Sequence, residues 1–206
     1  MNPTLIGMMD SPYVRRVAIS LRRMGIAHEH RKLSVFRNYA EFRAINPVVK
    51  APTLVCADGT VLMDSTLILD YLEGLVAPER RLMPAAGAPR REALRLIGLA
   101  MAACEKAVQI VYEFEQRPAE KRHAPWLERV TEQANAAYGE LERAATKATP
   151  WLQGDRFGAE DVAVAVAWRF GQYYNAECIP AARHPALVAY SACAEALPEF
   201  LETPLD

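Results

Sequence analysis

Asp10-Ser11-Pro12-Tyr13-Val14-Arg15-Arg16 is the stretch that decides the fold of this chain. It follows an apolar run over 5–9, which predicts a buried strand, and it opens a segment whose apolar residues recur at helical spacing. Ser11 then falls at the N-cap of the helix and Pro12 at its first position. The N-terminus of a helix carries free N–H groups and about half an elementary positive charge, so it is suited to hold an anion. Taken alone, a Ser-Pro pair at a helix start is most often only a cap.

The composition is that of an ordinary globular protein, and it limits the possible partners. The 206 residues are 51% hydrophobic and 24% charged, which allows one large domain or two small ones. With 24 basic and 25 acidic residues the formal net charge is −1, so we expect no nucleic-acid partner and no anionic membrane surface. No apolar stretch approaches the roughly 20 residues that span a bilayer, and the first residues lack the charged region of a secretion signal. We therefore expect a cytoplasmic protein.

The cysteines and histidines form no pattern typical of a metal or redox site. The four cysteines lie far apart, at Cys56, Cys104, Cys178 and Cys193. They make no CxxC pair and no ligand spacing with the histidines, so we expect reduced, mostly buried thiols and no metal. His28 and His30 alternate along a predicted strand and share one face, where a solvated surface is a simpler interpretation than a metal site.

The first 78 residues predict a small α/β unit with a mixed sheet. The first helix stops at Gly25, and a short strand is expected over 28–33. Because a helix connects the two strands, they are expected to pair in parallel. A loop and a short helix follow over 36–45.

A hairpin and a second clear helix complete this unit. The strand that follows begins at Pro52, and Asp58-Gly59 forms a turn that returns the chain as an antiparallel strand over 61–63. The next helix opens at Asp64-Ser65-Thr66, with Ser65 as its predicted N-cap.

The rest of the chain shows only helical patterns. Prolines and glycines over 79–89 predict a linker. Four helices are then expected, at 91–115, 126–148, 162–174 and 184–197. The third is apolar almost all round, which is typical of a helix buried at the centre of a bundle. The predicted organisation is a domain at 1–78, a linker at 79–89 and an all-helical domain at 90–206.

Four motifs, in order along nearly the whole chain, resemble the glutathione transferase superfamily, and most closely its bacterial Ser-type members. They are Ser11-Pro12-Tyr13-Val14-Arg15, Lys50-Ala51-Pro52-Thr53-Leu54, Asp64-Ser65 with Tyr71-Leu72-Glu73, and Gly154-Asp155-Arg156-Phe157 with Asp161. Each motif is weak alone, and the four together are strong. The resemblance implies a thioredoxin-like N-terminal domain followed by a C-terminal helical bundle, glutathione as co-substrate and a homodimer. The order of elements predicted from the residues agrees.

The resemblance gives Ser11 the role of holding the glutathione sulfur. Redox proteins of the thioredoxin type carry CxxC where this chain has Ser11-Pro12-Tyr13-Val14, so the thiol must come from the ligand. A free thiol has a pKa of about 8.5, and lowering it by ~2 units requires ~2.7 kcal/mol. A charged hydrogen bond of ~1.5–3 kcal/mol and ~0.3–1 kcal/mol from the helix end supply that amount. Tyr13 is the alternative activator.

The resemblance also assigns residues that bind the rest of glutathione. Pro52 matches the family's cis-proline, which turns the Ala51 backbone outward so that it pairs with the peptide as an added strand. Lys50 either binds the glycyl carboxylate or is simply solvated. At the γ-glutamyl end, Asp64 suits the ammonium group, and Ser65 with the helix N–H groups suits the carboxylate.

The electrophile is expected to bind beside the first long helix of the bundle. The candidates on that helix are Met101, Cys104, Glu105, Val108 and Tyr112. Core packing is the default interpretation for all of them except the tyrosine. The sequence does not identify the electrophile.

One motif departs from the family pattern. Gly158 stands where Ser or Thr is usual, so the side-chain half of a capping box is lost. Asp161 can still bond the Gly158 N–H, and it is expected to be structural rather than catalytic.

These features predict a glutathione transferase that activates the thiol for attack on a small hydrophobic electrophile, with a role in detoxification. Two alternatives stay open. One is a glutathione-dependent isomerase, dehalogenase or peroxidase. The other is a binding or regulatory protein of this fold that has lost catalysis.

Overall fold

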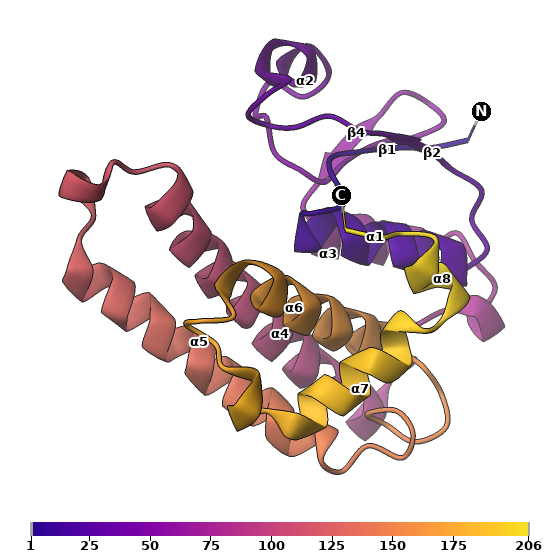
Figure 1. Cartoon of the computed structure of the whole chain (residues 1–206). Helices are drawn as coiled ribbons and strands as arrows, with labels where there is room; N and C mark the ends of the chain where they lie inside the picture. The colour runs from indigo at the N-terminus through magenta and orange to yellow at the C-terminus, as the bar shows by residue number, and fades with distance from the viewer. Residues whose placement is uncertain (1, 206) are drawn as a thin grey trace. The chain divides into compact units, whose positions relative to one another are not determined.

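The computed structural model describes residues 2–205, and the chain divides by its contacts into two compact units. The first unit joins Met1–Leu82 to Leu197–Asp206, and the second is Met83–Ala196. In Figure 1 the first unit holds the indigo and purple elements together with α8. The sequence-based division at 79–89 groups the last ten residues with the helices, and it stays a prediction about domains.

The first unit contains a mixed four-stranded sheet in the order β2-β1-β3-β4. Its strands are β1 (Thr4–Ile6), β2 (Glu29–Arg31), β3 (Thr53–Val55) and β4 (Val61–Met63). β1 pairs in parallel with β2 and antiparallel with β3, and β3 pairs antiparallel with β4. The predicted parallel crossover and the predicted hairpin are therefore confirmed.

β1 is shorter than the apolar run predicted. The strand expected to continue to Met9 ends at Ile6, because Gly7 adopts a φ of 142° and the chain then turns. In this turn the Ser11 N–H donates to the carbonyl of Met8 at 3.2 Å. The turn leads directly into the first helix.

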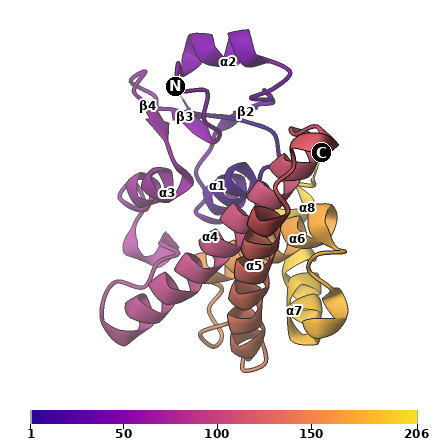
Figure 2. The same ribbon diagram turned by 90° about the vertical axis from the view of Figure 1, so that its left-hand side faces the viewer.

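The helices of the first unit lie on both faces of its sheet (Figures 1 and 2). They are α1 (Pro12–Arg23), α2 (Tyr39–Ile45), α3 (Ser65–Glu73) and α8 (Pro198–Leu201), with a 3-10 turn, η1 (Pro78–Arg80). α1 and α3 pack against each other on one face, and α2 covers the other. Under α2, Ile6, Leu33 and Phe42 form a buried apolar cluster. The predicted apolar face of α1, from Val14 to Met24, is fully buried.

The N-cap of α1 is the residue predicted from the sequence, whereas the N-cap of α3 is not. Ser11 is the N-cap of α1 and Pro12 its first residue, as predicted. The prediction of Ser65 as the N-cap of α3 is wrong. Asp64 takes that position, because its Oδ1 accepts from the Thr66 N–H at 2.9 Å, and Ser65 becomes the first residue of the helix.

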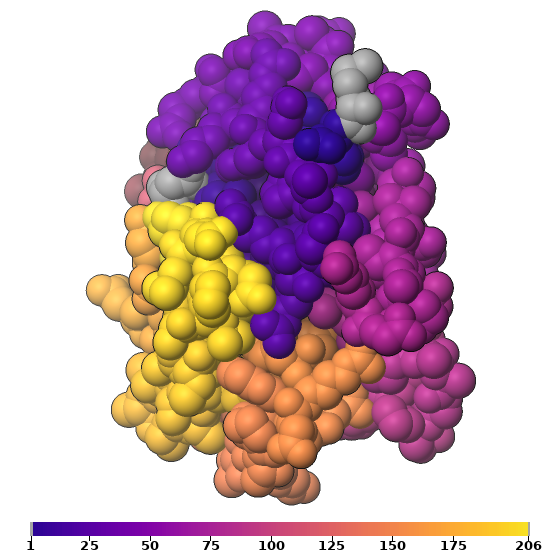
Figure 3. Space-filling model, turned by 90° about the vertical axis from the view of Figure 1, so that its right-hand side faces the viewer, coloured from indigo at the N-terminus to yellow at the C-terminus, as the bar shows by residue number. Residues whose placement is uncertain are grey.

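The last residues of the chain pack on α1 (Figures 1 and 3). The buried Arg15 donates from Nε to the carbonyl of Thr203 at 2.8 Å, and its guanidinium lies 5.5 Å from the ring centre of Phe200. Arg23 forms an ion pair with Glu199 at 2.9 Å. Arg22 pairs with a further acidic residue of this segment, Glu202. Three arginines of α1 thus hold the C-terminal segment.

The second unit is helical. Its long helices are α4 (Gly87–Glu115), α5 (Ala124–Ala145), α6 (Ala159–Asn175) and α7 (Pro185–Glu195), with 3-10 turns η2 (Ala119–Lys121) and η3 (Ala181–Arg183). α4 packs on α5 and α6, and α6 packs on α7. Thirteen of the 17 residues of α6 are buried, so α6 is the central helix that its apolar sequence predicted.

Asp161 holds the start of α6. Its carboxylate accepts from the N–H of Gly158 at 2.6 Å, from the N–H of Leu152 at 2.9 Å and from the hydroxyl of Tyr190. Burial and the Asp161 carboxylate raise the pKa of Tyr190 well above its usual range, so this hydroxyl stays a donor. The predicted hydrogen bond from the Gly158 N–H to the Asp161 side chain is therefore confirmed.

The buried carboxylate of Glu160 lies close to Gly158. A Cβ on Gly158 would lie 2.6 Å from Oε2 of Glu160, which is closer than any real contact allows. The buried Glu160 carboxylate therefore occupies the space that a serine or threonine side chain would need. Gln153 donates to its other oxygen at 2.7 Å and holds the carboxylate in place.

His184, also in the second unit, gives a testable pH dependence. It is buried, with its ring centre 5.4 Å from that of Trp168 and 6.2 Å from that of Tyr138. No residue within 2–205 forms a hydrogen bond with either ring nitrogen. Burial lowers the pKa of His184 below 6.5, so the unfolded chain binds its proton first.

This histidine should therefore make stability fall in acid. Its contribution is complete above about pH 6.5, the unfolded pKa, and is lost as the pH falls towards the lower folded pKa. We expect the unfolding free energy of the wild type, measured by urea titration between about pH 7.5 and 5, to fall more steeply than that of His184→Phe. His123→Gln, at an exposed histidine, should keep the wild-type slope. Parallel curves for wild type and His184→Phe would contradict this assignment.

Candidate functional site

Ser11 lies at the N-terminus of α1 with its hydroxyl only weakly engaged. Its φ of −71° and ψ of 122° are those of an extended N-cap, and its carbonyl accepts from the Arg15 N–H at 2.9 Å. The cap contact itself, from the Val14 N–H to Ser11 Oγ, is long at 3.4 Å. Ser11 and Tyr13 are both partly exposed. The Ser11 hydroxyl therefore has capacity left for a ligand.

Gly7 brings the start of α1 close to Ala51. A Cβ on Gly7 would lie 2.5 Å from Cγ2 of Val14 and 3.2 Å from Cβ of Ala51. With a φ of 142°, this position favours glycine on both conformational and steric grounds. This role was not predicted, although a glycine inside a predicted strand is a known signal of close backbone approach.

A chain of hydrogen bonds fixes the loop around Pro52. The Ala51–Pro52 peptide bond is cis, as the resemblance implied. The buried Asn46 donates from Nδ2 to Thr53 Oγ1 at 2.8 Å, and that hydroxyl donates to the carbonyl of Lys50 at 2.7 Å. The side chain of Lys50 is exposed. Asn46 and Thr53 were not predicted, because their role depends on contacts within the folded loop.

The start of α3 is tied to α1 by a buried arginine. Arg16 is 2% exposed and donates from Nη1 to Ser65 Oγ and to Thr66 Oγ1, both at 3.3 Å. Asp64 adopts a φ of 73°, in the half of conformational space that non-glycine residues avoid. Such backbone conformations occur often at functional sites, where surrounding structure maintains them.

The three predicted binding segments thus converge within the first unit. Gly7 links the Ser11 turn to Ala51, and Arg16 links α1 to Ser65. What they present together is a hydroxyl at one helix start, a loop with a cis-proline, and a carboxylate and a hydroxyl at a second helix start. Such a set suits a short peptide with charged ends.

The electrophile candidates lie along one face of α4, at Met101, Glu105, Val108 and Tyr112, in steps of three or four residues. Met101 and Val108 are half-buried, and Tyr112 is 45% exposed. Glu105 is exposed and accepts from Gln109 Nε2 at 3.1 Å, so core packing is the wrong interpretation for it. Cys104 is fully buried and does pack in the core.

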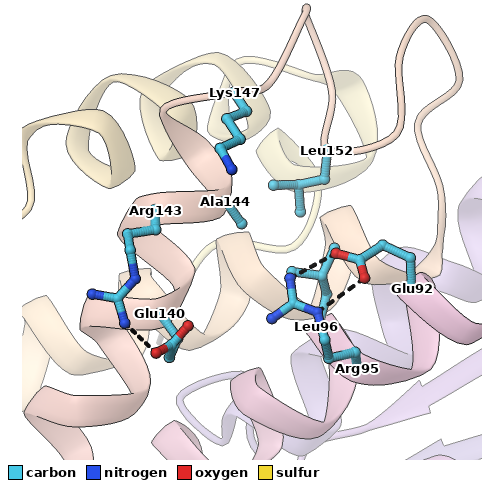
Figure 4. Close-up of a pocket in the computed structure, with 8 residues that line it drawn as sticks. All are labelled: Glu92, Arg95, Leu96, Glu140, Arg143, Ala144, Lys147 and Leu152. Atoms are coloured by element: carbon cyan, nitrogen blue, oxygen red, sulfur yellow. Dashed lines mark hydrogen bonds and ion pairs between the residues drawn. The ribbon is translucent and has the colours of Figure 1, made fainter.

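A cavity of about 250 Å³ in the second unit lies elsewhere, between α4 and α5 (Figure 4). It is lined by Glu92, Arg95, Leu96, Glu140, Arg143, Ala144, Lys147 and Leu152. Its walls carry two ion pairs, Arg95 with Glu92 at 2.6 Å and Arg143 with Glu140. None of the predicted electrophile residues lines this cavity, so it does not support that assignment.

Residues 2–205 lack two further kinds of feature. No helix in this range combines the length and the apolar character needed to cross a membrane. Nor does the range bring together three His, Cys, Asp or Glu side chains in an arrangement that could hold a metal ion.

Comparison with known proteins supports the resemblance. Residues 5–80 match the family model of the glutathione S-transferase N-terminal domain. The chain is 28% identical over 164 residues, 79% of each chain, to the uncharacterized GST-like protein YibF of Escherichia coli K12.

Solved structures match over nearly the full length. A glutathione S-transferase of Methylobacterium radiotolerans in complex with glutathione sulfonate is 29% identical, with a TM-score of 0.90 over 98% of this chain and 94% of that one. A glutathione transferase family member of Pseudomonas fluorescens Pf-5 with bound glutathione is 28% identical, with a TM-score of 0.87 over all of both chains. The first unit is thus the thioredoxin-like domain of this fold and the second its helical region. Residues 5–80 belong to the glutathione S-transferase N-terminal domain family, and the chain as a whole is similar to members of the glutathione transferase superfamily.

Proposed function

We propose that this chain is a Ser-type glutathione transferase, which activates the thiol of glutathione for attack on a small hydrophobic electrophile. The observation that carries the proposal is the convergence of Ser11, Ala51–Pro52 and Asp64–Ser65 through Gly7 and Arg16. Similar chains of known structure hold glutathione or its sulfonate. None of the four cysteines, all within residues 2–205, forms a disulfide, which suits a reducing, cytoplasmic setting.

Ser11 acts on the sulfur. Its hydroxyl donates to the glutathione sulfur, and the positive end of α1 adds to the stabilisation of the thiolate. The thiol proton passes to water, the sulfur forms a bond to an electrophilic carbon, and the electron pair of the broken bond leaves with the departing group. Tyr13, two residues on, is the alternative donor.

The remaining residues position the peptide. The Ala51 backbone beside Pro52 pairs with the peptide, and Lys50 takes its glycyl carboxylate. Asp64 takes the ammonium group of the γ-glutamyl end and Ser65 its carboxylate. The half-buried Met101 and Val108 with Tyr112 form an apolar face for the electrophile, and the exposed Glu105 lies on the same face.

Calorimetric titration with glutathione, followed by product analysis with an activated aryl chloride, tests the proposal. We expect saturable binding and a conjugate formed in a one-to-one ratio with the glutathione consumed. Turnover that returns free glutathione would instead establish an isomerase, and oxidation of glutathione by a hydroperoxide a peroxidase. Binding without turnover would establish a non-catalytic member of the family, and absence of binding would overturn the proposal.

A homodimer is part of the proposal. β4 and α3 expose several apolar side chains, including Met63 at 39%, Leu67 at 65% and Tyr71 at 41% exposure. Monomeric proteins rarely expose apolar side chains grouped in this way, whereas a dimer interface would bury them. We expect light scattering to give twice the chain mass for the wild type and a single mass for Leu67→Glu, which places a charge on this face. Leu201→Glu, at the equally exposed Leu201 of α8, is the matched control and should remain dimeric. Wild-type and Leu67→Glu samples of equal mass would contradict the proposed interface.

A further inference from the structure

We propose that Arg16 is a positioning residue that makes the Ser65 hydroxyl a hydrogen-bond donor to the carboxylate of the bound γ-glutamyl group. The inference rests on the proposed function, since it concerns the end of glutathione that lies at α3. It assigns to Arg16 the preference of the site for a ligand with a free carboxylate at that end.

The geometry fixes the direction of the hydrogen bonds. The Arg16 guanidinium carries only N–H donors and accepts nothing. Its Nη1 lies 3.3 Å from Ser65 Oγ and 3.3 Å from Thr66 Oγ1, so each hydroxyl oxygen is the acceptor. A hydroxyl that accepts in this way keeps one hydrogen to donate elsewhere.

The hydroxyl hydrogen of Ser65 is available to a ligand. Ser65 is the first residue of α3 and is 4% exposed. No residue within 2–205 accepts from its hydroxyl. A buried hydroxyl of this kind is costly unless an acceptor is supplied, and a carboxylate at the positive end of α3 is the acceptor that the helix favours.

Arg16 also adds a fixed charge behind the hydroxyl. A guanidinium is ionised at every physiological pH, and at 2% exposure it is little screened by water. This charge and the positive end of α3 both favour an anion at Ser65. The hydrogen bond that Arg16 orients, unlike its charge, acts only at the γ-glutamyl end.

The test compares two peptides that differ by one group. Glutathione and γ-aminobutyryl-cysteinylglycine share the amine, the thiol and the glycyl end, but the second lacks the γ-glutamyl carboxylate. We expect the wild-type chain to bind glutathione about tenfold or more tightly than the analogue in calorimetric titrations. Arg16→Met, which keeps the bulk of the stem, should reduce this preference to about threefold or less. In Arg16→Met the affinity for glutathione should fall, while the affinity for the analogue should not.

Two further measurements separate positioning from structure. Ser65→Ala should lose the same preference, and the double variant should lose no more, because both changes remove one interaction. The pH dependence of conjugation should be the same in Arg16→Met as in the wild type. A merely structural role would weaken both peptides equally.

The failures of the two proposals are distinguishable. If the wild type binds neither peptide, the proposed function is wrong. If it binds both equally, the assignment of the γ-glutamyl carboxylate to Ser65 is wrong together with the role of Arg16, while glutathione binding itself stands. If Arg16→Met keeps the wild-type preference, only the role of Arg16 is overturned. Should Arg16→Met fail to fold by circular dichroism, Arg16→Lys replaces it, because the lysine side chain keeps the charge but ends one bond short of Nη1, the atom that bonds both hydroxyls. An unchanged preference in Arg16→Lys would then overturn the inference.

Discussion

Ser11→Ala is expected to lower the rate of glutathione conjugation about ten- to a hundredfold at about pH 6.5, with the affinity for glutathione nearly unchanged. The thiolate loses a charge-assisted hydrogen bond of ~1.5–3 kcal/mol, so the pKa of the bound thiol rises by about 1–2 units. Each unit removes about nine-tenths of the thiolate at a pH below both values. The pH profile of kcat/KM should shift to higher pH by the same amount, and the deficit should shrink in alkaline solution.

Stability and Tyr13 provide the controls for this experiment. The cap contact of Ser11 is long, at 3.4 Å, so Ser11→Ala should cost no more than about 1 kcal/mol of unfolding free energy. Tyr13→Phe should leave the pH profile in place. If Tyr13→Phe shifts the profile and Ser11→Ala does not, Tyr13 is the group that stabilises the thiolate.

Asp161→Ala is expected to destabilise the chain by about 3–5 kcal/mol, measured by urea unfolding. Asp161 is fully buried, and its carboxylate accepts from two backbone N–H groups and from the hydroxyl of Tyr190. Alanine leaves these donors buried without an acceptor, at about 1–3 kcal/mol each before relaxation. The central helix of the second unit would lose the contact that fixes its start.

Two variants nearby calibrate this effect. Asp155→Ala removes an exposed carboxylate of the same loop and should change stability by no more than about 0.5 kcal/mol. Tyr190→Phe removes one of the three donors and should cost only part of the Asp161→Ala effect. A loss below about 1 kcal/mol for Asp161→Ala would show that these hydrogen bonds do not hold α6.

Features set by local rules could be predicted from the sequence. The cap at Ser11, the proline at position 12 and the buried face of α1 depend only on residues within one helix. The parallel crossover follows from chain connectivity. At α3, two neighbouring residues can each cap the helix, and the positive φ of Asp64 decided between them. That conformation is held by tertiary structure and leaves no local signal.

In the candidate site, too, the features that depend on tertiary contacts could not be predicted from the sequence. The motif residues could be named, but the residues that join the motifs could not, since Gly7, Asn46 and Arg16 act on distant segments. Arg15 and Arg16 look alike in the sequence. Successive helical residues point about 100° apart, so one turns to Thr203 and the other to Ser65. The electrophile candidates on α4 were predicted together from the sequence, and their contact with an electrophile stays a prediction.

The contacts between α1 and the C-terminal segment affect when the first unit can finish folding during translation. A ribosome makes α1 before every helix of the second unit and Phe200 only after all of them. Nascent domains generally fold in the order in which they emerge. Here the partners of the buried Arg15 guanidinium, Phe200 and Thr203, are synthesised only after the whole second unit. The unit that is translated first is therefore the last to be completed.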